Sequence, residues 1–83
     1  MQFSRRSEEL ELAGNIVTIQ ELSAAEYTKV MDTEDEQAQL MELLTASLTI
    51  KVTPDEIMGW PNSIVNQLTD AVLSINGLNA SGN

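Results

Sequence analysis

The sequence predicts an α+β domain in which an N-terminal β-hairpin packs on a small bundle of three to four helices. Three observations indicate this fold: apolar and polar residues alternate on both sides of Gly14-Asn15, capping signals precede three segments, and residues 61–76 are amphipathic. With 83 residues, the chain has the size of one domain. We therefore expect a single domain over 1–83, with disordered ends at 1–7 and 79–83.

The first expected element is a hairpin centred on Gly14-Asn15. Gly adopts positive φ freely and Asn does so better than most residues, so this pair predicts a two-residue turn. An isolated hairpin is only marginally stable, so its apolar face is expected to pack on the helices. Counting outward from the turn gives the cross-strand pairs Ala13/Ile16, Leu12/Val17, Glu11/Thr18 and Leu10/Ile19, with the Leu, Val and Ile of the second and fourth pairs on one face.

Capping boxes predict the starts of three helices. In such a box a Ser or Thr side chain accepts from the third following N–H, and a Glu at that position bonds back to the capping residue. The pattern occurs at Ser23 with Glu26, Thr33 with Glu36, and Thr53 with Glu56. Apolar periodicity then predicts helices over roughly 24–31, 34–50, 54–59 and 61–76, the last closed by a Schellman motif at Gly77 in which Leu78 contacts Leu73.

The composition argues against most catalytic classes. The chain has 4 Lys and Arg against 13 Asp and Glu, a formal net charge of −9, and neither His nor Cys. It therefore lacks a disulfide framework, a thiolate nucleophile, the usual zinc ligands and the most common general base. A strongly acidic chain is also unsuited to nucleic acid, because binding a phosphate backbone requires cations. We expect no enzyme activity, no cofactor and no nucleic-acid partner.

The acidic run at 32–36 does not fit a calcium loop. A loop that starts at Asp32 would need Gly at its sixth position and Glu at its twelfth, where the chain has Gln37 and Leu43. Acidic residues before a helix are explained by the positive end of the helix dipole. Carboxylate pairs of the glycosidase type would need a deep cleft, which a small helical domain rarely forms. We therefore expect no metal site.

No membrane segment is expected either. Residues 1–6 include Arg5 and Arg6, but Ser7-Glu8-Glu9 follows in place of the apolar stretch of a secretory signal. No apolar run approaches the ~20 residues that span a bilayer. The predicted location is the cytoplasm.

Five residues are candidates for a protein-binding surface. Met58, Trp60 and Pro61 lie at the expected elbow between two helices, and Tyr27 and Met31 lie on the first helix. Met adapts to irregular apolar partners, and Trp is enriched at interface hot spots. The alternative is that these side chains fill a small core. The Leu-rich run at 40–44 is assigned to the core, and the sequence leaves self-association open.

An acyl-carrier role is the alternative suggested by size and acidity. Carrier proteins attach phosphopantetheine to the Ser of an Asp-Ser-Leu motif at the start of their second helix. The nearest match is Asn62-Ser63-Ile64, which lacks the acid and precedes the last helix. The expected hairpin is also unlike an all-helical carrier.

The order of elements resembles that of the small tail assembly chaperones of tailed bacteriophages and prophages. The similarity covers about residues 10–78, and it is carried by residues 17–26, with Glu21-Leu22-Ser23 and Glu26 at a helix start, and by 43–48, 53–61 and 75–77. The resemblance implies a factor in the bacterial host cytoplasm that binds the long tape-measure protein, and in addition tail-tube protein, during tail assembly. It supplies no invariant site residues. An unrelated acidic interaction domain is the remaining alternative.

Overall fold

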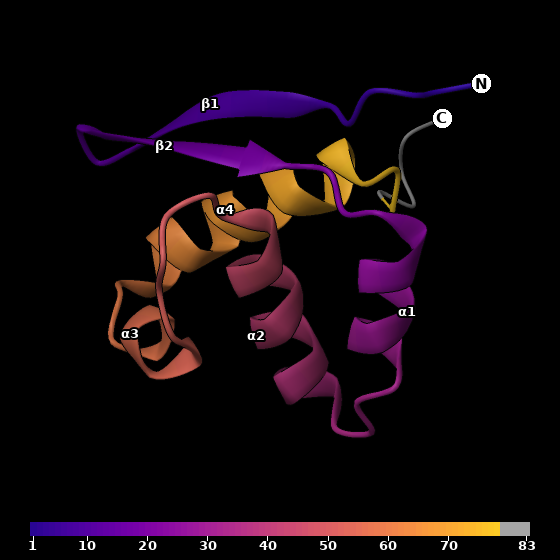
Figure 1. Ribbon diagram of the computed structural model, residues 1–83. Coiled ribbons are helices and arrows are strands. Elements are labelled where there is room, and N and C mark those ends of the chain that lie inside the picture. The colour runs from indigo at the N-terminus through magenta and orange to yellow at the C-terminus, as the bar shows by residue number, and fades with distance from the viewer. Residues whose placement is uncertain (79–83) are drawn as a thin grey trace.

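A β-hairpin lies across a layer of four helices in the computed structural model, which describes residues 1–78 (Figure 1). The hairpin contacts α4 along both strands, while α2 contacts α1, α3 and α4. This arrangement confirms the expected α+β class. The elements are β1 (Ser7–Leu12), β2 (Asn15–Gln20), α1 (Ala24–Met31), α2 (Glu36–Ser47), α3 (Pro54–Met58) and α4 (Asn62–Ile75).

The hairpin turn is formed by Ala13 and Gly14, one residue earlier than predicted. The predicted cross-strand register is therefore wrong. Their φ angles of 51° and 86° are those of a type I′ turn, in which Gly is favoured at the second central position. Asn15 is instead the first residue of β2, and its side chain donates to the carbonyl oxygen of Leu12 at 3.3 Å. The observed pairs are Ser7/Gln20, Glu8/Ile19, Glu9/Thr18, Leu10/Val17, Glu11/Ile16 and Leu12/Asn15.

The apolar face of the hairpin packs on the helices as expected. Moving the turn by one residue changes each cross-strand partner by two residues, so Leu10, Leu12, Val17 and Ile19 still share one face. Leu12 and Ile19 are buried, and Leu10 and Val17 are partly buried against the core. The fully buried core side chains are Ile19, Leu44, Ile57, Leu68, Val72 and Ser47.

α2 is shorter at both ends than the predicted helix over 34–50. Its N-cap is Asp35, which accepts from the N–H of Ala38 at 2.9 Å, so the predicted capping box at Thr33 is wrong. The Thr33 hydroxyl instead donates to the Glu42 carboxylate. At the other end Leu48 adopts an extended conformation and forms a bridge with Ile19 of β2.

The remaining helix ends follow the sequence signals. Capping boxes at Ser23 and Thr53 open α1 and α3. α4 ends in the predicted Schellman motif: the N–H of Leu78 donates to the Leu73 carbonyl at 2.8 Å, and Gly77 has a φ of +70°.

The N-terminal segment makes contacts up to the start of β1. Ser7, expected in the disordered end, is the first residue of β1. Arg5 forms an ion pair with Glu26 at 3.1 Å, and the Arg6 guanidinium donates to the carbonyl oxygen of Ile75. The expectation for 79–83 lies outside the described residues. Within residues 1–78, no helix combines the length and apolarity required to span a bilayer.

A candidate protein-binding groove

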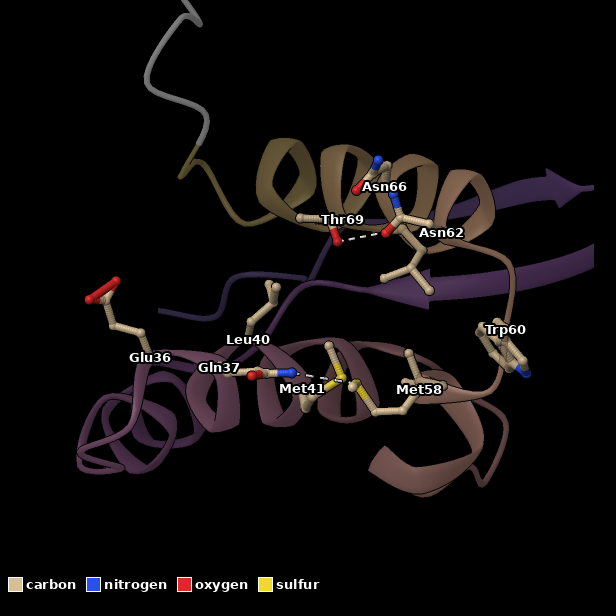
Figure 2. A pocket seen from close by; sticks show the side chains of 11 residues that line it. Glu36, Gln37, Leu40, Met41, Met58, Trp60, Asn62, Asn66 and Thr69 are labelled. Carbon is tan, nitrogen blue, oxygen red and sulfur yellow. Dashed lines mark hydrogen bonds between the residues drawn. The ribbon is translucent and has the colours of Figure 1, made fainter.

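An open groove of about 710 Å³ lies between helices α2, α3 and α4 and is called here the α2–α4 groove (Figure 2). Apolar side chains from all three helices form most of its surface, with Trp60 at one end. The groove is large enough to hold several side chains of a partner. Its lining residues are Glu36, Gln37, Leu40, Met41, Ile57, Met58, Trp60, Asn62, Val65, Asn66 and Thr69.

The short helix α3 explains why a methionine remains exposed here. The helix is opened by Thr53 and ends at Gly59, so it makes little more than one turn. Ile57 points into the core and is fully buried, whereas the next side chain, Met58, is 56% exposed. The amide of Gln37 on α2 reaches the Met58 sulfur at 3.7 Å (Figure 2). A flexible thioether therefore forms one wall of the groove.

Trp60 lies between the α2–α4 groove and a second hollow beneath the hairpin. This hollow has a volume of about 390 Å³, and Trp60 contributes to the walls of both cavities. The indole is half-buried, so part of the ring remains open to a partner. The other residues of the second hollow are Leu12, Ala13, Asn15, Val17, Ile50, Pro61 and Ile64.

Four of the five predicted surface residues lie along one connected surface. Met58 and Trp60 line the α2–α4 groove, and Pro61 lines the neighbouring hollow beneath the hairpin. Met31 is 39% exposed and lines a smaller hollow that shares Glu36 and Leu40 with the groove.

Tyr27 is not part of this surface. It is half-buried, and it lines a separate hollow with Leu22 and Leu78. The sequence interpretation also missed Leu40 and Val65, two half-buried residues that line the groove. The core assignment of the Leu-rich run holds for Leu40 in part, because its side chain packs against the core and is only partly buried. The packing of α2 beside α4 leaves the rest of the side chain accessible in the groove.

The groove is bordered by carboxylates. Glu36 lines it directly, and Asp35 and Glu42 line an adjoining hollow that shares Met41 and Met58 with it. These three residues are called the acidic rim. Neither of the two hollows is lined by Lys or Arg within the described part of the chain. The potential over the groove is therefore negative, which favours a cationic partner.

The groove offers apolar contact and carboxylates, and we find no metal-binding cluster near it. Among residues 1–78, no group of three or more His, Cys, Asp or Glu side chains is arranged to hold a metal ion. Ser63, the candidate carrier position, is exposed in the first turn of α4 next to Asn62 of the groove.

The fold and groove together define a small acidic α+β domain with an open apolar groove bordered by carboxylates. Comparison of the chain with protein-family models, curated proteins and solved structures finds no match.

Proposed function

We propose that this protein is a tail assembly chaperone of a tailed bacteriophage or prophage. It binds the tape-measure protein, and in addition tail-tube protein, in the bacterial cytoplasm and catalyses no reaction. The observation that carries the proposal is the α2–α4 groove, which the 56% exposed Met58 lines together with Trp60 and Leu40. The order of the elements, which resembles that of these chaperones, supplies the identity of the partner.

A binding protein of this kind has to cover apolar side chains and keep the complex dissolved. The groove supplies apolar contact through Leu40, Met58 and Val65. Burial of apolar surface contributes about 25 cal/mol per Å² removed from water, although ordering the partners offsets part of this gain. The formal net charge of −9 keeps neighbouring complexes apart by repulsion. Both properties suit a protein that protects a long helical partner from aggregation.

Co-expression with a tape-measure protein from the phage or prophage that encodes this chain tests the proposal. We expect the wild-type chain to increase the soluble fraction of the tape-measure protein, as measured by sedimentation and gel densitometry. The variant Met58→Glu should lose most of this effect, because it places a charge on the apolar wall of the groove.

Ile16→Ser is the matched control for that variant. Ile16 is another exposed apolar residue, at 69% exposure, but it lies on the outer face of the hairpin, away from the groove. Its replacement should leave the solubilising effect unchanged. If the wild-type chain gives no increase in soluble tape-measure protein, the proposed function is wrong. If Ile16→Ser is as damaging as Met58→Glu, the groove is not the binding site.

A further inference from the structure

We propose that the α2–α4 groove binds an amphipathic α-helix that carries Lys and Arg beside its apolar stripe. The inference rests on the proposed function only in taking the groove as the site where the partner binds. It adds the conformation and the charge of the segment that the groove accepts.

The helical conformation follows from the walls of the groove. An extended segment leaves its backbone N–H and C=O groups without intrasegment partners, so it needs an open sheet edge or polar side chains along its path. The groove is walled by residues of helices α2, α3 and α4 and by none of a strand, and away from the helix ends the backbone groups bond within each helix. Two of the polar side chains are also engaged: Gln37 with Met58, and Thr69 with the carbonyl of Val65. A helix satisfies its own backbone and presents only side chains to such walls.

The adaptable lining favours the same kind of partner. Met58 on α3 is 56% exposed, whereas Met41 on the neighbouring α2 is buried, and Trp60 closes one end of the groove. The flexible thioether of Met58 accommodates the uneven ridges of an apolar helix stripe, and an aromatic residue at the end can act as an anchor.

The charge of the partner follows from the acidic rim of Asp35, Glu36 and Glu42. An apolar stripe seated over Leu40 and Met58 places the flanking positions of the partner helix near these carboxylates. Lys and Arg at those positions have long stems that cover apolar surface while their charged ends reach the carboxylates. Acidic residues at the same positions would be repelled.

The chain's own cations lie elsewhere and do not neutralise the rim. Arg5 pairs with Glu26, and Arg6 bonds to Glu21 and to the end of α4. Lys29 is on α1, and Lys51 lies in the segment before α3. None of the four lines the groove or the hollow that adjoins it.

Two synthetic peptides test the proposal with the full chain. The first is an amphipathic helix of about five turns, with a Leu and Ala stripe flanked by Lys. The second replaces each Lys by Glu. Neither contains Trp, so the fluorescence of Trp60, the single Trp of the chain, reports on the groove directly. We expect the Lys peptide to bind with a blue shift of Trp60 emission, because the indole loses contact with water, and the Glu peptide not to bind.

Two variants with equal net charge separate the acidic rim from general attraction. The first combines Asp35→Asn, Glu36→Gln and Glu42→Gln, and it keeps a capping side chain at 35. The second neutralises Glu8, Glu9 and Glu11 in β1 to Gln. Each variant loses three negative charges, so both have a formal net charge of −6 instead of −9. We expect the rim variant to bind the Lys peptide about tenfold more weakly and the β1 variant within about twofold of the wild type.

Three results would overturn the inference: an unchanged Trp60 spectrum with saturating Lys peptide, equal binding of the Glu peptide, or equal losses in the two variants. These results are distinct from the co-expression outcome. A chain that solubilises the tape-measure protein but does not bind the Lys peptide keeps the proposed function and refutes this inference.

Discussion

Ala13 has the least favourable backbone conformation of the hairpin. Its φ of 51° lies in the left-handed region, which disfavours a residue with a Cβ by about 1–2 kcal/mol. Gly14, the next residue, also has a positive φ but does not carry this cost. The Ala13 side chain is exposed, so another residue at this position would not disturb the core.

Replacing Ala13 by Asn should therefore stabilise the protein. Asn tolerates the left-handed region better than Ala, and Asn-Gly is the preferred pair of a type I′ turn. We expect the free energy of unfolding to rise by about 0.5–1 kcal/mol and the Tm by a few degrees, measured by thermal and urea denaturation.

Ala25→Asn is the control for that substitution. Ala25 is an exposed residue of α1, where the same change should lower stability by about 0.5 kcal/mol because Ala is the better helix former. If Ala13→Asn also lowers the Tm, the turn does not have the conformation described here.

The turn also shows what the sequence could predict at this scale. A two-residue turn can place Gly14 either second, after Ala13, or first, before Asn15, and the two choices bury the same strand face. The pattern of Leu10, Leu12, Val17 and Ile19 therefore predicts the buried face correctly, although the turn itself was predicted one residue late.

At the scale of elements, the start of α1 shows how a capping box combines with an ion pair. The Ser23 hydroxyl accepts from the N–H of Glu26 at 3.1 Å, and the Glu26 carboxylate accepts from the N–H of Ser23 at 2.9 Å. The same carboxylate oxygen pairs with Arg5. The backbone N–H of Ser23 lowers the pKa of Glu26 most, partial desolvation opposes this, and Arg5 and the Ser23 hydroxyl lower the pKa further.

This pKa predicts a pH dependence of stability. A carboxyl group whose pKa is lower in the folded than in the unfolded chain stabilises the fold above its ordinary pKa of 4.5. The contribution is lost as the pH falls from that value through the lowered pKa. Wild type should therefore exceed Glu26→Gln in unfolding free energy near neutral pH, by no more than about 0.5 kcal/mol because the pair is exposed, and the difference should vanish in acid.

Urea denaturation at several pH values measures this difference, and an NMR titration of the Glu26 carboxyl group gives its pKa directly. Glu9→Gln removes the same charge from the outer face of the hairpin and controls for net charge. A titration midpoint for Glu26 at or above 4.5 would contradict the prediction.

Helix boundaries could be predicted where the signal is local and not where tertiary contacts compete. Ser23 and Thr53 each precede a helix without a rival cap, and both predictions are confirmed. Before α2, Thr33 and Glu36 complete the capping-box pattern, but Asp35 is the observed cap and the Thr33 hydroxyl bonds to Glu42 instead. α2 ends early because Leu48 bridges to β2, which no periodicity within residues 34–50 could indicate.

At the scale of the whole molecule, the groove could be predicted only in part. Met58, Trp60 and Pro61 are close in sequence, so their proximity in space required no knowledge of the fold. The contributions of Leu40 and Val65 depend on how α2 packs beside α4. Tyr27 lies apart because α1 and α3 contact α2 on opposite sides (Figure 1).

One side chain joins three parts of the fold. Asn76 follows α4, and its Oδ1 accepts from the N–H of Leu22 at 2.8 Å, between the hairpin and α1. Its Nδ2 donates to the hydroxyl of Ser47 at 3.3 Å and to the carbonyl of Val72 at 2.9 Å. Ser47 is the last residue of α2 and is fully buried. The end of α4 is thus bonded to the end of α2 and to the segment after the hairpin.

Removing this connection should destabilise the whole domain. In Asn76→Ala the Leu22 N–H and the Ser47 hydroxyl lose their partner, and an unsatisfied buried polar group costs about 1–3 kcal/mol. We expect a loss of that size in urea denaturation. Asn66→Ala, an exposed position on α4, should change stability by no more than about 0.5 kcal/mol. Ser47→Ala should be less damaging in the Asn76→Ala background than in the wild type, because the shared bond is already absent. Strict additivity of the two substitutions would show that Asn76 and Ser47 do not act together.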